Sequence, residues 1–106
     1  MMKFKVIWSY FAEEKIDEIF EYHKTEAGLR IAKKLLSSLI EAPDILIDNQ
    51  HVGQIEELLM EREEKYRYLL HKNYKIIYSV DEENGLIKVA DVFDTRQNPI
   101  KMKRNK

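Results

Sequence analysis

The chain has 106 residues and a mass of 12.7 kDa, which is enough for one small hydrophobic core but not for two. Hydrophobic residues make up 44% and charged residues 35% of the chain, and this composition excludes collagen-like, low-complexity and disordered proteins. The sequence contains no cysteine and its three histidines share no metal-ligand spacing, so we expect neither a metal nor a cofactor.

The opening residues contain no extended apolar segment and no small-residue cleavage site. We therefore expect a cytoplasmic protein that does not contact a membrane. The net charge of -1 conceals an asymmetry, because residues 1–64 carry 8 basic and 14 acidic side chains whereas residues 65–106 carry 10 basic and 5 acidic ones. Such a polarity favours a protein partner with a basic surface, or a local contact with nucleic acid.

The first half of the chain predicts one strand and two helices. Residues 3–8 are rich in β-branched and aromatic side chains and predict a strand, after which Ser9 can cap a helix that begins at Tyr10. This helix is expected to end near Gly28, and a second amphipathic helix follows up to at least residue 42. Pro43 either ends the second helix or begins another turn, since the apolar stripe continues beyond it.

The second half predicts an antiparallel sheet. Residues 54–59 form either an edge strand or an irregular connection, and a hairpin around Asn73 is the strongest strand signal in the chain. Its two strands span residues 66–72 and 74–80, and a further strand is expected over residues 86–93. The polar tail is mainly basic from about residue 97, which is typical of a solubilising end.

The order of the elements predicts an α+β fold with the sequence β-α-α-β-β-β, formed by a single domain over residues 1–106. Only one crossover is available and tight turns join the later strands, so the sheet is mainly antiparallel. The two helices form a hairpin that buries its apolar stripe on one face of this sheet. Alternation along the central strand predicts that the core side chains on this face include Tyr74, Ile76, Tyr78 and Val80, and that Lys75, Ile77 and Ser79 face away.

Several short motifs, taken in the order in which they occur along the chain, resemble the RelE/ParE superfamily of toxins from type II toxin-antitoxin modules. The resemblance covers nearly the whole chain, and Gly53 precedes the sheet as a glycine does in that family. The similar segments are Val6-Ile7-Trp8-Ser9 with Ala12, Ile16-Asp17-Glu18-Ile19-Phe20-Glu21-Tyr22, Tyr66-Arg67-Tyr68-Leu69-Leu70, Asn73-Tyr74-Lys75-Ile76-Ile77-Tyr78, and the last strand with its tail from Val89 to Pro99.

The resemblance implies one of two activities. RelE-like members cut messenger RNA on the ribosome, whereas ParE-like members inhibit DNA gyrase by protein contact. The RNA-cutting branch uses basic residues on its central strands and a C-terminal arginine and tyrosine, and Arg67, Lys75 and Arg96 occupy corresponding positions here. The tyrosine has no counterpart, and Leu69 replaces one of the hairpin lysines. The set of nuclease residues is therefore incomplete.

We accordingly expect a ParE-like toxin that binds gyrase, is not an enzyme, and is neutralised by a cognate antitoxin. The alternatives are a ribosome-dependent mRNA endonuclease, with Arg67, Lys75 and Arg96 as catalytic cations and His71 as a possible proton carrier, and an inactive homologue or binding module. The functional surface is expected at the end of the last strand, where Arg96 projects beside Arg67 and Lys75 into a concavity. In the structural alternative Arg96 pairs with Asp91 or Asp94 and braces the tail.

Overall fold

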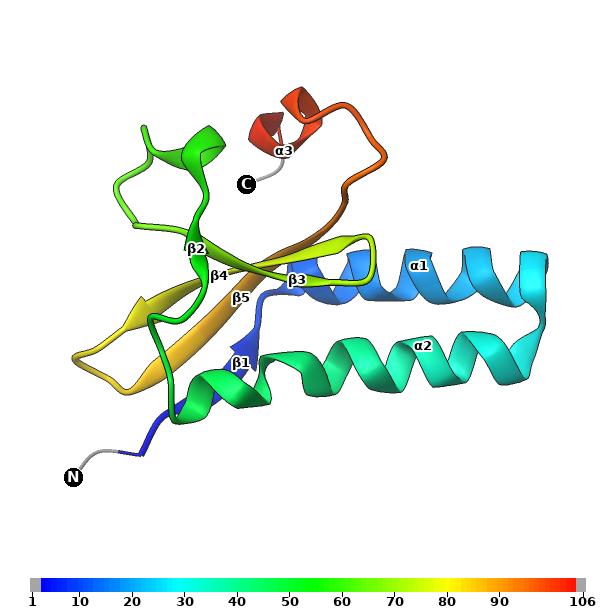
Figure 1. The fold of residues 1–106 in the computed structure, drawn as a ribbon, viewed down its shortest axis with the longest axis horizontal. Coiled ribbons are helices and arrows are strands. Elements are labelled where there is room, and N and C mark those ends of the chain that lie inside the picture. The colour runs from blue at the N-terminus through cyan, green and yellow to red at the C-terminus, as the bar shows by residue number, and fades with distance from the viewer. Residues whose placement is uncertain (1–2, 105–106) are drawn as a thin grey trace.

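The computed structural model describes residues 3–104, and Figure 1 shows a helical hairpin beside one twisted sheet. The sheet has the order β1-β5-β4-β3-β2, in which β1 is parallel to β5 and the other neighbours are antiparallel. This arrangement confirms the predicted α+β fold. The elements are β1 (Lys5–Trp8), α1 (Tyr10–Ala27), α2 (Leu29–Glu41), the 3-10 helix η1 (Ala42–Ile47), β2 (Gln54–Ile55), the 3-10 helix η2 (Glu57–Leu59), β3 (Arg67–His71), β4 (Tyr74–Asp81), β5 (Leu86–Asp94) and α3 (Ile100–Arg104).

Local sequence signals set the ends of the helices. The Ser9 hydroxyl accepts a hydrogen bond from the Ala12 amide at 3.0 Å, which caps α1 as predicted. Gly28 separates the two helices with a φ of 100°, a conformation that an L side chain rarely adopts, so the chain can reverse there. Pro43 lies in the first turn of η1, and it therefore ends the α-helix and begins a tighter turn.

The main core lies between the helical hairpin and one face of the sheet. Ala12 and Ile16 of α1 and Leu35 and Leu39 of α2 pack with buried side chains of β4 and β5, among them Ile76. A neighbouring cluster joins Tyr78, Ile87 and Leu46, so η1 extends the cover over the same face. The predicted inward set on β4 is confirmed.

An irregularity in the pairing of β4 with β5 shapes this core. Ile77 pairs with Asp91, but the next residue, Tyr78, pairs with Val89, so Ala90 has no partner opposite it. The extra residue places Val89 and Val92 on the same face although they are three positions apart, and both are buried under the helices. Strict alternation along β5 would have turned one of them outward.

The other face of the sheet carries a second, smaller core that the sequence analysis did not predict. Ile77 and Phe93 point away from the helical hairpin, yet they are buried because Leu59 of η2 and Met102 of α3 cover them. The expectation of a purely solubilising tail is therefore wrong for its described part, since α3 packs through Met102, which is only 2% exposed. Figure 1 shows α3 close to the segment that carries η2.

The edge of the sheet is fastened through one tyrosine. Residues 54–59 combine both predicted alternatives, because two of them pair with β3 as β2 and η2 then turns away. The Tyr78 hydroxyl donates to the Gln50 carbonyl at 2.9 Å and accepts from the Gly53 amide at 3.0 Å.

Among the described residues, no helix has the length and apolar character that a membrane span needs.

Candidate functional site

A cleft of about 370 Å³ opens where β5 ends and α1 passes beside it; we call it the Arg96 cleft. Ile19 and Val92 contribute its apolar lining. Charged, aromatic and amide side chains surround them, from α1 on one side and from the strand ends and the segment after β5 on the other: Lys15, Glu18, Tyr22, Tyr74, Asp94, Arg96 and Gln97. The predicted location of the functional surface therefore coincides with a cleft.

Arg96 is held at the rim of this cleft by Asp94. Its Nη2 lies 2.8 Å from Oδ2 of Asp94 and its Nε lies 3.0 Å from Oδ1, which is a bidentate pair. Asn73 adds a hydrogen bond to Oδ1 at 3.1 Å. The bonds from Arg96 are the main reason that the pKa of Asp94 falls to about 2, so this carboxylate stays charged at neutral pH. Arg96 itself remains 62% exposed and can still meet a ligand.

Two further contacts fix the walls of the Arg96 cleft. The Tyr74 hydroxyl and Nε2 of His23 are 2.9 Å apart, and this bond joins β4 to α1; burial raises the pKa of the Tyr74 hydroxyl. Deeper in the wall, Nζ of Lys15 lies 3.2 Å from Oδ1 of the buried Asp91 and above the ring of Phe93. Burial raises the pKa of Asp91, and the ammonium group of Lys15 opposes that rise.

The other predicted cations do not line this cleft. Nη1 of Arg67 donates to the carbonyls of Gly53 at 2.9 Å and His51 at 3.3 Å, so it braces the loop before β2. Nζ of Lys75 lies 2.8 Å from Oε1 of the buried Glu56. In the hairpin, Arg67 is opposite Tyr78 and Lys75 is opposite Leu70, so the two side chains leave opposite faces.

His71 is also engaged elsewhere. Its Nε2 lies 3.0 Å from the hydroxyl of Ser38, which joins β3 to α2. The expected convergence of Arg67, Lys75 and Arg96 is therefore wrong, because each cation has a protein partner of its own. The structural alternative for Arg96, its pairing with Asp94, is what the structure contains. An exposed arginine with tyrosines and paired charges is suited to recognising a macromolecular surface by contact.

Sequence reasoning missed the two tertiary pairs that build the cleft walls. His23 follows Ile16 and Ile19 on the apolar stripe of the first helix, and a histidine on such a stripe is the available signal for a buried hydrogen bond. Lys15 and Asp91 are 76 positions apart, and nothing in their local sequence distinguishes them from solvent-facing charges. Only the docking of α1 on β5 brings these two residues together.

The fold of this chain, a helical hairpin on one face of a mainly antiparallel sheet, also occurs in a solved structure. That structure is entitled "Chromosomal ParDE TA system from P. aeruginosa" and matches with a TM-score of 0.72 and 19% sequence identity. The similarity covers 87% of this chain and 96% of that chain. The comparison with curated proteins gave no match.

The match of the sequence to a family model gives a more specific assignment than the fold does. The model of the family described as "ParE toxin of type II toxin-antitoxin system, parDE" matches residues 6–99, which include both long helices, strands β2 to β5 and all of β1 except its first residue. The chain therefore belongs to the ParE toxin family.

Proposed function

We propose that this protein inhibits growth by binding DNA gyrase and that a cognate antitoxin neutralises it in the cytoplasm. The observation that carries the proposal is the family match over residues 6–99. The engagement of the other cations supports binding over RNA cleavage. A phosphodiester transition state needs cations that are free to meet developing charge, whereas Lys75 is held by a buried carboxylate and Arg67 by backbone carbonyls.

Arg96 is proposed as the residue of the cleft that meets the target. Growth of cells that express the wild-type protein should be inhibited, and Arg96→Ala should restore growth without a large loss of thermal stability, because the side chain is exposed. Arg30→Ala, an exposed arginine on α2, is the matched control and should remain toxic. Toxicity retained in a folded Arg96→Ala protein would exclude this role.

Two assays on the purified protein separate the proposed target from the alternative. Inhibition of DNA supercoiling by gyrase is expected, together with no cleavage of messenger RNA on translating ribosomes. The opposite pair of results would favour the endonuclease, and then Arg67 and Lys75 should be tested by substitution. A protein that is inert in both assays and harmless to cells would favour the inactive homologue.

The antitoxin is tested separately by co-expression. The product of an adjacent gene should co-purify with this chain and restore growth. Failure of every neighbouring gene product to bind would contradict the proposed module, even if gyrase were inhibited.

A further inference from the structure

A second cleft, of about 580 Å³, lies at the amino-terminal end of α1, and it shares no lining residue with the Arg96 cleft. We call it the aromatic cleft. Three rings line it: Tyr10 and Phe11 from the first turn of α1, and Tyr66 from the segment before β3. Two carboxylates, Glu14 and Glu64, stand among them. No part of the proposed toxin mechanism uses this cleft.

The carboxylate of Glu64 is held in place from below. The hydroxyl of Ser79, a side chain of β4 that is 3% exposed, donates to Oε1 of Glu64. The second oxygen, Oε2, is paired with Nζ of Lys88 at a distance of 3.6 Å. The side chains are 39% exposed for Lys88 and 48% exposed for Glu64, so solvent reaches the pair, the pair is weak, and an incoming cation can replace the lysine. One oxygen is therefore fixed and the other can accept a new donor.

The aromatic rings of this cleft, like its carboxylates, favour a positively charged ligand. Tyr10 is 76% exposed, and its hydroxyl bonds to Glu14. Tyr66 is half-buried beside Glu64, and both burial and that carboxylate raise the pKa of its hydroxyl. Aromatic faces attract cations, and carboxylates next to them strengthen the attraction. Among the residues that line the cleft, Lys88 is the one base against Glu14 and Glu64, which gives the lining a net charge of -1; outside the lining, Nζ of Lys15 lies 5.1 Å from the centre of the Phe11 ring and Arg62 opposes the rise in the pKa of Tyr66.

An anion does not suit this cleft, although a helix begins beside it. The Ser9 hydroxyl already accepts a hydrogen bond from the Ala12 amide, and Glu13 adds a negative charge in the first turn of α1. One of the amides that could hold a phosphate is therefore occupied, and the acidic side chain offsets the partial positive charge of the helix end.

We propose that the aromatic cleft binds an arginine side chain presented by a protein partner. The planar guanidinium can stack on Tyr10 or Tyr66 while its N–H groups donate to Oε2 of Glu64 and to Glu14. Arginine fits better than lysine because it can stack and donate in a fork at the same time. The inference holds whichever macromolecule the Arg96 cleft contacts, because the two clefts have no residue in common.

The test is a titration of the isotope-labelled full chain, followed by amide NMR shifts. The probe is the peptide acetyl-Gly-Arg-Gly-amide, and its neutral counterpart carries citrulline, which keeps the shape and removes the charge. The arginine peptide should shift the amides of residues 10, 14, 66 and 88 in a saturable way, with half-saturation roughly in the millimolar range expected for a single anchor. Equal shifts with the citrulline peptide, or no shifts at all, would overturn the proposal.

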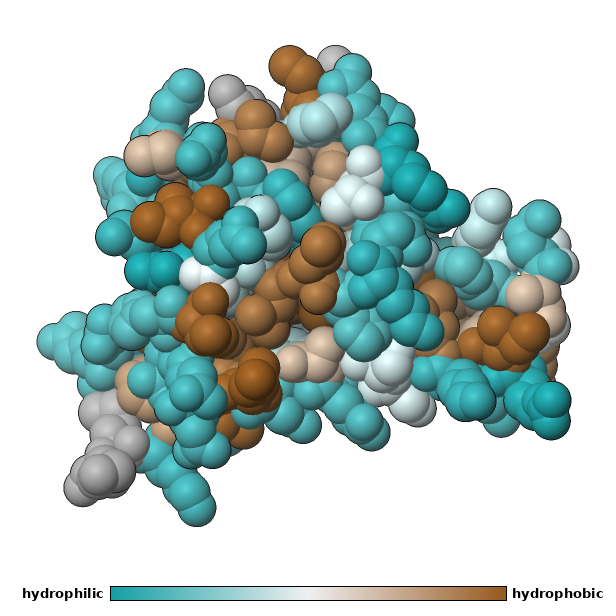
Figure 2. Space-filling model, viewed as in Figure 1, coloured by the Kyte–Doolittle hydropathy of each residue, from teal (hydrophilic) through white to brown (hydrophobic). Residues whose placement is uncertain are grey.

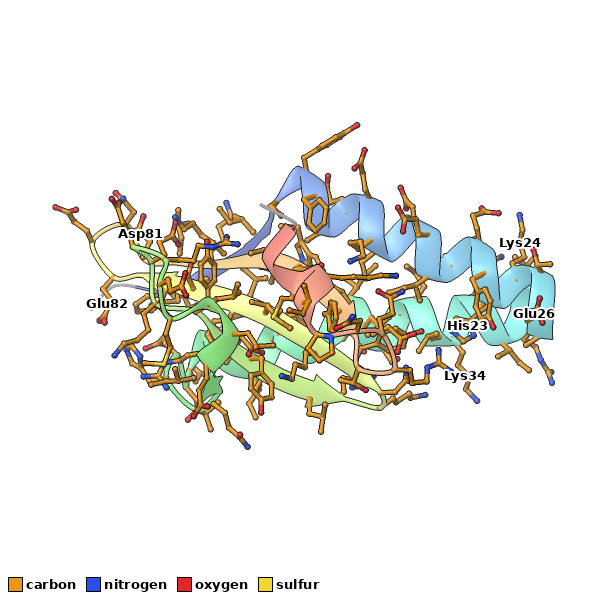
Figure 3. All side chains as sticks on the ribbon, turned by 90° about the horizontal axis from the view of Figure 1, so that it is seen from above. His23, Lys24, Glu26, Lys34, Asp81 and Glu82 are labelled. Atoms are coloured by element: carbon orange, nitrogen blue, oxygen red, sulfur yellow. The ribbon has the colours of Figure 1, made fainter. Side chains whose placement is uncertain are left out.

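Variants locate the binding in the cleft. Glu64→Gln and Tyr10→Leu should each weaken the arginine peptide by about tenfold, whereas Glu26→Gln should leave the titration unchanged. Glu26 is a suitable control because it lies at the far tip of the helical hairpin (Figure 3). Tyr10 is so exposed that its substitution should preserve the fold even if Glu64→Gln does not. An unchanged affinity in Tyr10→Leu would count against the cleft.

One further titration tests whether the bound cation is a protein side chain or a free polyamine. Spermidine presents ammonium groups without a planar guanidinium, and it should shift the same amides less than the arginine peptide does at equal concentration. Stronger shifts with spermidine would overturn the assignment to a protein side chain and indicate a free polyamine instead.

Discussion

Gly53 shows how closely single residues are constrained at the sheet edge. A Cβ atom added there would lie 2.5 Å from the hydroxyl oxygen of Tyr78 and 2.8 Å from the backbone carbonyl oxygen of Tyr68. The hydroxyl cannot withdraw without losing its bonds to the Gly53 amide and the Gln50 carbonyl. The glycine that precedes the sheet is therefore required by close approach, because any side chain would collide with the hairpin.

Gly53→Ala should lower the free energy of unfolding by about 2 kcal/mol, through overpacking and disturbance of the buried tyrosine. Equilibrium unfolding in urea would measure the loss. The neighbouring substitution Val52→Ala is the control, and we expect a change within about 0.5 kcal/mol because Val52 is exposed. Equal stability of Gly53→Ala and the wild type would show that the loop can move away from Tyr78.

The lowered pKa of Asp94 predicts that the free energy of unfolding depends on pH. Its pKa falls from an ordinary 3.8 to about 2 in the folded protein, mainly because Arg96 donates to it. A lowered pKa means that the carboxylate stabilises the fold above about pH 4, and that this contribution is lost as the pH falls towards 2. The difference in unfolding free energy between wild type and Asp94→Asn should therefore shrink over this interval.

Urea unfolding at several pH values from 2 to 7 would follow that difference. Arg96→Ala should flatten the same part of the profile, since it removes the principal cause of the shift. A difference between wild type and Asp94→Asn that stays constant down to pH 2 would contradict the assignment.

Among the elements, the β3–β4 hairpin connects the two cores. Ile76 is fully buried under the helices, whereas Leu70 on the partner strand is 65% exposed. We expect Ile76→Ala to cost about 2–5 kcal/mol because it leaves a cavity, and Leu70→Ala to cost far less. Losses in urea unfolding that are similar for the two variants would mean that the faces of the hairpin are assigned wrongly.

The short helix α3 has a measurable role of its own. Met102 is its buried contact with the second core, where it meets Leu59, Ile77 and Phe93. Met102→Ala should therefore destabilise the protein by about 2 kcal/mol, although it lies close to the end of the sequence. Lys101→Ala, at the exposed neighbouring position, serves as the control and should be nearly neutral. A neutral Met102→Ala would indicate that α3 does not pack in solution.

These elements also show what the sequence could and could not predict. The hairpin was predictable because β-branched and aromatic residues alternate on both sides of Asn73. The cover on the second face was not predictable, since α3 has five residues and, of the three whose side chains the structure describes, Met102 alone is buried. The bulge at Ala90 has no signal in composition, and the partners of Arg67 and Lys75 depend on a loop whose path only the tertiary structure defines.

On the scale of the whole molecule, the acidic and basic halves of the sequence contribute different elements. The acidic half contains β1 and both long helices, and the basic half contains β3, β4 and β5. Figures 1 and 3 show the helices reaching beyond the sheet, with His23, Lys24 and Glu26 at their tip and Asp81 and Glu82 at the opposite end of the molecule. In Figure 2 apolar side chains gather over the middle of the visible face, around β3. Surfaces of different character are thus available to different partners.

The pairing of the first strand with the last predicts an order of folding. Residues that pair in the β3–β4–β5 meander are near one another in sequence, whereas Lys5 pairs with Leu86. Long-range pairing must overcome a larger loop-closure entropy, so β1 should join after the transition state. Val6→Ala should therefore accelerate unfolding and leave the refolding rate nearly unchanged, which stopped-flow mixing in urea would measure. A refolding rate that falls in proportion to the stability would place β1 in the nucleus instead.

The late docking expected for β1 affects how the folded toxin can be degraded. A β1 that docks last in folding is among the first segments to detach in local opening, while the meander and its second core stay formed. Detachment would uncover the outer edge of β5 and the hydrophobic side chains that β1 protects, including Ile87 and Val89. The amides of β5 would then report the lifetime of the folded toxin in hydrogen exchange, and a protease would reach the chain first between its opening strand and α1.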